Sequence, residues 1–374
     1  MRLTQSQLTQ LETPCLVVDV AQVRRNIAKM QQAVARTGCA LRPHIKTHKM
    51  PLFARMQVEA GACGITCAKV SEAEVMAAGG LRDIFIAYPL VGAFRIRRAL
   101  ALARHLDRLI LAVDSLPGAE ALSEAAAAAG QEVEIRLEID TGAGRTGIPF
   151  SEATALACRI ARLPGLRLTG IYTFKSLGYR GAPTEDTDLA AREEGELMAE
   201  AARRLRAAGV EIRDISAGST PTALGAAQTG LVTEVRPGTY LFNDLLLCQE
   251  HAATPDEIAV RYAATVISAN HPDYAVLDGG CKTFSTDLVP NTPPYYFPGY
   301  AAVEGHPDLY LQRMNEEHGM VVAAEGHTGL QSGEILTLLP LHVCTAVNLQ
   351  NSLYLLWEDG RLTREAVAAR GCTV

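Results

Sequence analysis

The stretch Arg42-Pro-His-Ile-Lys-Thr-His-Lys49 follows a short apolar run and includes the end of the first strand-like segment that sets the fold of this chain. Five of its residues can carry a positive charge. Crowding of cations favours the neutral form of a lysine amine, which can then act as a nucleophile or a base. Lys46 is the candidate for that role. A solvated basic loop or a phosphate-binding patch is the alternative interpretation.

Lysine is rare in this chain, which makes Lys46 more informative. Only six of the 35 basic residues are lysine, and the others are arginine. Lysine can lose its proton and form a Schiff base, whereas arginine stays charged. A lysine within a basic cluster therefore indicates chemistry as well as charge.

Strand-like runs alternate with Ala-rich or amphipathic helical stretches over about 200 residues. The runs lie near residues 40–45, 63–67, 83–87, 108–113, 133–139, 167–172, 212–216 and 232–235. Eight strands alternating with helices predict an α/β fold with a (β/α)8 barrel of TIM type. An open doubly wound sheet remains the alternative, because alternation alone separates the two poorly.

The pattern changes after about residue 245, where β-branched alternating segments replace the helical runs. We expect a barrel over residues 14–245 and a mostly β domain over residues 246–374. The Pro/Tyr-rich stretch Val289–Tyr300 is expected to form a long loop. The β segments are predicted at Ala259–Ser268, Tyr274–Leu277, Ile335–Leu339 and Ser352–Trp357.

Composition and charge exclude several classes of protein. The net charge of −6 argues against a general nucleic-acid binder. The N-terminus lacks the pattern of a secretion signal, and no segment stays apolar for about 18 residues, so no membrane partner is expected. Nine scattered cysteines indicate reduced thiols. We therefore expect a cytoplasmic enzyme-sized protein.

Residues that follow the strands of a barrel share its C-terminal face, where such folds place their chemistry. Lys46 follows the first run, Arg145 follows the fifth, and Tyr172 ends the sixth. Gly218-Ser-Thr220 and Gly238-Thr-Tyr240 follow the seventh and eighth runs, where hydroxyls and exposed amides can bind a phosphate. Helix capping by Ser219 or Thr220 is the alternative.

Gly142-Ala-Gly-Arg-Thr-Gly147 matches the glycine pattern of a dinucleotide site. Pro149 interrupts the helix that should begin there, and no acidic residue near 160–170 could bind a ribose. We interpret the glycines as a loop that presents Arg145.

His342-Val-Cys344 places an imidazole and a thiol two positions apart, which on a strand would face the same side. Zinc or another borderline-soft divalent ion suits these ligands, and core packing is the alternative. Glu316-Glu-His-Gly319 is a second polar cluster, for which a solvated turn is the alternative.

Together these motifs resemble the D-threonine aldolase and D-serine dehydratase family of pyridoxal-phosphate enzymes, related to alanine racemase. The motifs are Arg42–Lys49, Glu138–Gly147, Gly218-Ser-Thr-Pro-Thr222, Glu316–Gly319 and His342–Cys344. They occur in the family's order, from about Thr13 to about Trp357. The resemblance implies an alanine-racemase fold in which residues 1–20 can pack with the β domain. It also implies a homodimer.

The resemblance further implies roles for individual residues. Lys46 would carry pyridoxal 5'-phosphate as a Schiff base and act in catalysis, with His44 in support. Arg145 would lie beside the cofactor ring and Tyr172 would contact the pyridine. The phosphate would be held by Ser219, Thr220, Gly238 and Tyr240. A divalent metal, zinc or else manganese or magnesium, would bind His342 and Cys344, with Glu317 and His318 on the substrate side.

Dehydratases of this family typically carry His-x-Cys at the metal site, and the aldolases carry His-x-Asp. Cys344 therefore favours a lyase that removes water from D-serine, D-threonine or D-threo-3-hydroxyaspartate and gives a 2-keto acid and ammonia. An aldolase that yields glycine and an aldehyde is the alternative. A racemase or a regulatory cofactor-binding protein fits the residues less well. The segment Thr173–Tyr179 lacks the histidine that many members have there.

Overall fold

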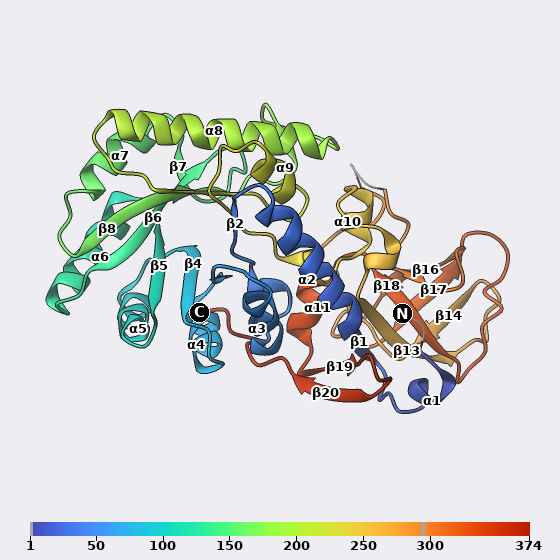
Figure 1. Ribbon diagram of the computed structural model, residues 1–374. Coiled ribbons are helices and arrows are strands. Elements are labelled where there is room, and N and C mark those ends of the chain that lie inside the picture. Colours follow the sequence, from blue (N-terminus) through green and yellow to red (C-terminus); the bar gives the residue numbers. More distant parts are fainter. Residues whose placement is uncertain (1–2, 293–295) are drawn as a thin grey trace. The chain divides into compact units, whose positions relative to one another are not determined.

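The computed structural model describes residues 3–292 and 296–374, which divide into two compact units. The barrel unit comprises Ala28–Lys46, Met50–Gly238 and Cys372–Val374. The β unit comprises the described residues within Met1–Ile27, Thr47–Lys49 and Thr239–Gly371. Figure 1 labels most of the helices and strands of both units.

The barrel unit is built on a parallel sheet with the strand order β2-β12-β11-β8-β6-β5-β4-β3. Each strand lies at one of the predicted runs, so this prediction is confirmed. The strands are β2 (Ala40–Leu41), β3 (Ile65–Cys67), β4 (Asp83–Pro89), β5 (Arg108–Val113), β6 (Val133–Asp140), β8 (Leu166–Tyr172), β11 (Asp214–Ala217) and β12 (Glu234–Val235).

The sheet closes on itself between β2 and β3. Thr66 N donates to Pro43 O at 2.8 Å, and Cys63 N donates to Leu41 O at 2.9 Å. His44 and Thr66 also form a parallel bridge. An open doubly wound sheet would leave both edge strands unpaired, so closure excludes that alternative. The predicted barrel is confirmed.

Helices connect the strands and bury one face each against the sheet (Figure 1). Helix α8 begins after Asp186, whose side chain accepts a hydrogen bond from Leu189 N at 2.9 Å. It packs beside α7 and α9 through a face rich in alanine. The helices are α3 (Pro51–Glu59), α4 (Val70–Ala78), α5 (Ala93–Ala103), α6 (Leu116–Ala128), α7 (Ala153–Ile160), α8 (Thr187–Ala207) and α9 (Ala223–Gln228). Helix α2 (Val20–Ala35) has residues in both units.

An ion-pair network lies among the barrel strands, where an apolar layer would be usual. Glu234 on β12 binds Arg42 Nε at 2.7 Å and Arg136 Nη1 at 2.5 Å. Arg42 also binds Asp83, the first residue of β4, and Arg136 binds Asp214, the first residue of β11. The two arginine side chains are almost fully buried. Such charges are tolerated in a core only when they are paired.

The β unit contains a sheet with the order β14-β17-β16-β15-β18-β13-β1-β19-β20, and a further pairing of β13 with β14 closes part of it into a ring. Each predicted β segment coincides with a strand. The strands are β1 (Cys15–Asp19), β13 (Val260–Ser268), β14 (Tyr274–Leu277), β15 (Ala301–Val303), β16 (Leu309–Met314), β17 (Gly319–Ala323), β18 (Ile335–Pro340), β19 (Ser352–Leu356) and β20 (Leu362–Ala366).

The N-terminal strand β1 belongs to this second sheet. It pairs antiparallel with β13 and parallel with β19, and its first four residues are buried. The unit also holds α1 (Gln5–Leu8), α10 (Leu245–Gln249) and α11 (Cys344–Leu349). Part of the expected Val289–Tyr300 loop, residues 293–295, lies outside the described residues. No helix in the described ranges is long and apolar enough to cross a membrane.

Candidate active site

Lys46 lies in the 3-10 turn η1 (Ile45–Thr47), directly after β2. Its side chain is exposed, whereas its neighbours Ile45 and Thr47 are fully buried. The backbone N of Lys46 donates to His44 Nδ1 at 3.2 Å. The amine of Lys46 is therefore presented from a well-packed backbone, as a nucleophile requires.

The crowding of cations expected around Lys46 is only partly present. Arg42 turns into the barrel interior and pairs with Glu234 and Asp83. Burial alone would lower the pKa of Arg42, but the charges of Glu234, Cys63 and Asp83 raise it above its ordinary value. The charge of Arg42 is thus neutralised by carboxylates.

Phe174, just after β8, brings Lys46 and Arg145 together. Lys46 Nζ lies 5.7 Å from the centroid of the Phe174 ring, and the guanidinium carbon of Arg145 lies 4.4 Å from it. Arg145 is exposed in the loop after β6, as predicted from the glycine pattern. The ring occupies the segment that lacks the family's usual histidine, and it supplies cation–π attraction there.

Tyr172 ends β8 and is buried. Its hydroxyl donates to Glu138 Oε2 at 2.8 Å, and its ring meets Phe85 edge-on. Burial and the negative charge of Glu138 hold the pKa of Tyr172 well above its ordinary value. Tyr172 is therefore a neutral hydroxyl oriented by Glu138, a partner to which the sequence interpretation gave no role.

Hydrogen bonds hold the first, seventh and eighth strand connections together. Gly238 N donates to Thr220 Oγ1 at 3.2 Å, and His44 N donates to Pro237 O at 2.9 Å. Helix α9 begins only at Ala223, so Ser219 and Thr220 do not cap it. The capping alternative for these two residues was wrong.

The seventh connection is shaped by Glu194 of α8, which sequence reasoning missed. Its carboxylate accepts hydrogen bonds from Gly218 N at 3.1 Å and Thr222 Oγ1 at 3.0 Å. Gly218 has φ +83, and an added Cβ would lie 2.9 Å from Ala223 Cα. A larger residue would therefore displace the loop that carries Ser219 and Thr220.

These groups fit pyridoxal phosphate. Lys46 offers an exposed primary amine, and the Ser219 and Thr220 hydroxyls are neutral donors of the kind that bind a phosphate. A pocket of about 300 Å³ adjoins Arg145 and Phe174. It is lined by Gly142, Ala143, Arg145, Phe174–Gly178 and Gly181–Pro183.

In the β unit, His342 and Cys344 do not lie on a strand. Strand β18 ends at Pro340 and α11 begins at Cys344, so His342 lies in the connection between them and Cys344 is the first residue of the helix. The strand geometry expected for the pair was wrong. The two side chains nevertheless lie close enough for the charge of Cys344 to raise the pKa of His342.

Asp244 orients His342 and was not predicted. Its Oδ2 lies 3.0 Å from His342 Nδ1 and accepts a hydrogen bond from Val343 N at 3.2 Å. Burial alone would lower the pKa of His342, but the charge of Cys344 and the hydrogen bonds to Asp244 and Cys344 raise it to about 11. A carboxylate on Nδ1 is the usual support for a histidine that binds a metal through Nε2.

The groups around Cys344 fit a divalent metal. Thr47 Oγ1 lies 3.2 Å and Thr239 Oγ1 lies 3.6 Å from Cys344 Sγ. Imidazole nitrogen and thiolate sulfur are ligands that zinc prefers. In the described part of the chain no three His, Cys, Asp or Glu side chains are spaced to hold a metal ion. Two protein ligands leave coordination positions open.

The remaining predicted residues lie elsewhere in the β unit. Tyr240 is buried in the 3-10 turn η2 (Thr239–Leu241). Glu317 and His318 lie in the exposed turn between β16 and β17, where Glu317 pairs with Lys282 at 2.7 Å. Their assigned roles stay predictions.

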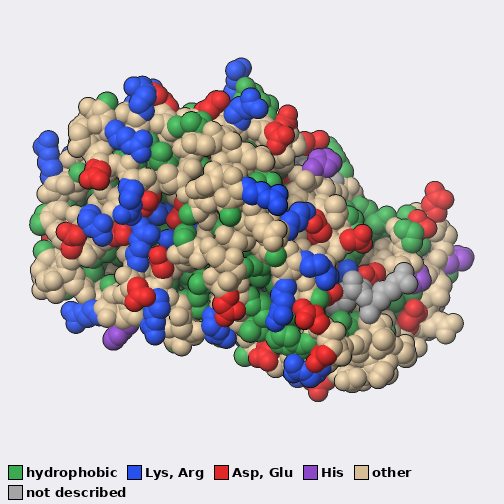
Figure 2. All heavy atoms as spheres, in the orientation of Figure 1, with side chains coloured by type: hydrophobic (Ala, Val, Ile, Leu, Met, Phe, Trp, Pro, Cys, Tyr) green, Lys and Arg blue, Asp and Glu red, His purple; other side chains and the backbone are tan. Residues whose placement is uncertain are grey.

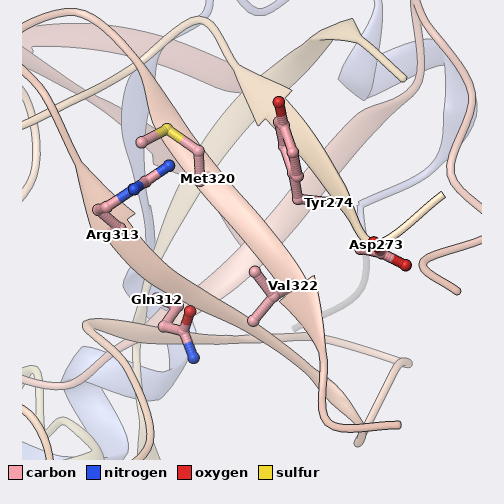
Figure 3. A pocket seen from close by; sticks show the side chains of 6 residues that line it. All are labelled: Asp273, Tyr274, Gln312, Arg313, Met320 and Val322. Carbon is pink, nitrogen blue, oxygen red and sulfur yellow. The ribbon is translucent and has the colours of Figure 1, made fainter. Parts of the chain in front are cut away.

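A pocket in the β unit is lined by none of the predicted site residues. It has a volume of about 260 Å³ and is formed by side chains of β14, β16 and β17 with Asp273 (Figure 3). The residues are Asp273, Tyr274, Gln312, Arg313, Met320 and Val322. On the face shown in Figure 2, acidic and basic side chains are interspersed. Neither feature points to a second chemical site.

Comparisons with known proteins agree with this architecture. The alanine racemase N-terminal domain family matches residues 18–245, and a serine dehydratase domain family matches residues 259–356. The chain is 36% identical to D-threo-3-hydroxyaspartate dehydratase of Delftia sp. (strain HT23), over 91% of this chain and 93% of that protein. It is 32% identical to D-threonine aldolase of Arthrobacter sp, over 92% and 89%.

A solved structure of a cysteine-to-alanine mutant of D-threo-3-hydroxyaspartate dehydratase, in the metal-free form, superimposes with a TM-score of 0.88. It is 33% identical, and the match covers 96% of this chain and 98% of that chain. The fold and the groups after the barrel strands define a pyridoxal-phosphate enzyme of alanine-racemase type. The chain belongs to the family of D-threo-3-hydroxyaspartate dehydratases and D-threonine aldolases, which are pyridoxal-phosphate-dependent lyases.

Proposed function

We propose that this protein is a divalent-metal-dependent dehydratase of D-3-hydroxy amino acids, such as D-serine, D-threonine or D-threo-3-hydroxyaspartate. The products would be a 2-keto acid and ammonia. The observation that carries the proposal is the pair His342 and Cys344, in which Asp244 holds His342 Nδ1 and a thiol stands beside the imidazole. In the family, cysteine at this position is typical of dehydratases.

The comparisons support both the reaction class and the metal. A relative that is 36% identical is a D-threo-3-hydroxyaspartate dehydratase. A mutant of such a dehydratase that lacks a cysteine is described in a metal-free form. Zinc is the ion that best suits nitrogen and thiolate ligands, with manganese or magnesium as alternatives.

Each group has a separate task in the proposed reaction. Pyridoxal phosphate supplies an electron sink for the charge that develops at the substrate Cα. Lys46 would hold the cofactor and would serve as the base for the proton at Cα. His342 and Cys344 would hold the metal, which would supply a Lewis acid for the β-hydroxyl. Asp244 keeps His342 in the tautomer that leaves Nε2 for the metal.

The proposal includes the other predicted residues. Lys46, His44, Arg145 and Tyr172 would surround the cofactor ring, and Glu317 and His318 would serve the substrate side. The phosphate would be bound by Ser219, Thr220, Gly238 and Tyr240. A homodimer is proposed from the family, and light scattering on the purified protein tests it.

A product assay tests the function. The purified protein is loaded with pyridoxal phosphate and zinc and mixed with each of the D-3-hydroxy amino acids, with and without a chelator. We expect keto acid and ammonia in equal amounts, lost on chelation. Glycine and an aldehyde without keto acid would instead establish the aldolase, the alternative supported by a relative that is 32% identical.

The variant Cys344→Asp installs the residue that aldolases of the family typically carry. We expect it to raise the share of glycine among the products. Unchanged products from this variant would remove Cys344 as the determinant of the reaction.

A further inference from the structure

The loop after β14 carries Asp287 to the side of His342 that Asp244 does not occupy. Asp287 Oδ2 lies 3.8 Å from His342 Nε2. Asp244 engages the other ring nitrogen, Nδ1. Asp287 therefore faces the nitrogen that remains for a metal.

Tyr262 joins this loop to the segment that carries the metal ligands. Its hydroxyl accepts a hydrogen bond from Ser285 N at 3.3 Å and donates to His342 O at 3.4 Å. Tyr262 is fully buried, and its ring stacks on Phe284 with centroids 4.3 Å apart. The position of Asp287 relative to His342 is thus determined by packing in the core of the β unit.

Two hydroxyls hold one oxygen of the Asp287 carboxylate. Thr345 Oγ1 donates to Asp287 Oδ1 at 3.1 Å, and Ser285 Oγ donates to the same oxygen. Ser285 Oγ and Thr345 Oγ1 are also within hydrogen-bond distance of each other, at 2.5 Å. The carboxylate is therefore oriented before any ligand arrives, with Oδ2 turned toward His342.

The spacing suits a metal-bound water. Nitrogen and oxygen ligands lie about 2.0–2.2 Å from zinc, so an ion bound to His342 Nε2, together with its water, is within reach of a carboxylate oxygen 3.8 Å from that nitrogen. In the described residues no third side chain completes a set of direct ligands. We therefore place a water molecule, bound to the ion, between the ion and the carboxylate of Asp287.

We propose that Asp287 is a further residue of the divalent-metal site, where its Oδ2 accepts a hydrogen bond from a water bound to the ion. The inference rests on the metal site of the proposed function. The negative charge of Asp287 favours a divalent cation, and its fixed position orients the water. A substrate hydroxyl that replaces this water meets the same acceptor. Asp287 is thus a positioning residue for the hydroxyl that leaves.

An ion pair between protonated His342 and Asp287, with no role toward a metal, would have the same distances. The two alternatives differ in what the loss of the Asp287 charge does to metal binding. If the two residues form only an ion pair, removing the charge of Asp287 does not lower the affinity of the protein for the metal. In the proposed site, removing it weakens the binding of the ion.

The test measures metal affinity. Cobalt(II) is bound to the metal-free protein, and its affinity is measured by competition with a chelator for the wild type, Asp287→Asn and Asp308→Asn. Asp308 is exposed in the same unit, so its variant is matched in charge change. We expect affinity about 10–100-fold lower for Asp287→Asn and unchanged for Asp308→Asn. The thiolate-to-cobalt absorption band should persist in both variants.

Thr345→Val is a second variant that keeps the carboxylate but removes one of its anchors. It should weaken cobalt binding less than Asp287→Asn does. Circular dichroism verifies that each variant is folded. Wild-type affinity in Asp287→Asn would overturn the inference alone. A wild-type protein that shows no thiolate-to-cobalt band would overturn the metal site of the proposed function and the inference with it.

Discussion

Asp244 Oδ2 lies 3.0 Å from Nδ1 of His342, although the two residues are 98 positions apart in the chain. The Asp244 side chain is fully buried, and its other oxygen accepts a hydrogen bond from Leu247 N, which caps α10. One carboxylate therefore both begins a helix and sets the tautomer of a proposed metal ligand.

Replacing Asp244 with Asn separates these two tasks. Asparagine caps a helix about as well as aspartate does, so α10 should remain intact. The neutral amide is a poorer partner for His342 Nδ1, and we expect metal affinity to fall about 10–100-fold. Chelator competition measures the affinity, and thermal unfolding of the metal-free protein is the control. Equal affinity in variant and wild type would contradict the orienting role.

Lys46→Ala should remove the cofactor linkage. We expect the absorbance band at about 420 nm to disappear and turnover to fall at least roughly 100-fold, because the base that takes the Cα proton is lost. Lys46→Arg keeps the charge but not the reactive amine and should behave in the same way. Lys29→Ala, at an exposed position, is the control. A retained band in Lys46→Ala would show that another residue binds the cofactor.

Glu234→Gln tests the ion-pair network in the barrel. Burial alone would raise the pKa of Glu234, but the charges of Arg136 and Arg42 hold it well below its ordinary value. The variant leaves two buried arginines without their shared carboxylate, and we expect a loss of about 3–5 kcal/mol in the free energy of unfolding. Glu132→Gln, which breaks an exposed pair with Arg167, should cost at most about 1 kcal/mol.

The pH dependence of this loss has a definite sign. Because the pKa of Glu234 is lower in the folded state, its stabilisation is fully present above the ordinary glutamate value of 4.5. It is lost as the pH falls through the lower folded-state value. The difference between the wild type and Glu234→Gln should therefore shrink as urea unfolding is measured at pH values progressively below 4.5. A difference that grows on acidification would contradict the assignment.

The repeating pattern predicted the eight strands and the order of the site residues, and the closure of the sheet between β2 and β3 then excluded an open sheet. Lys46 and Arg145 lie in the connections after β2 and β6, and Tyr172 ends β8, as expected. This succeeds because strand and helix periods are local, and because parallel strands place their carboxyl ends on one face. The His342 and Cys344 motif was recognised from its residue types, although His342 precedes α11 and Cys344 begins it, so that neither residue lies on a strand.

The partners of those residues were decided by the tertiary structure. Glu138 reaches Tyr172 across neighbouring strands, Asp244 meets His342, and Asp287 is held by Ser285 and Thr345. No local signal marks an acidic residue whose partner lies far along the chain, since its role exists only after strands pair and loops pack. The sequence by itself determined which residues can do chemistry. The packing of the core decided which carboxylates orient them, because only a buried and fully paired network holds a charged side chain in place.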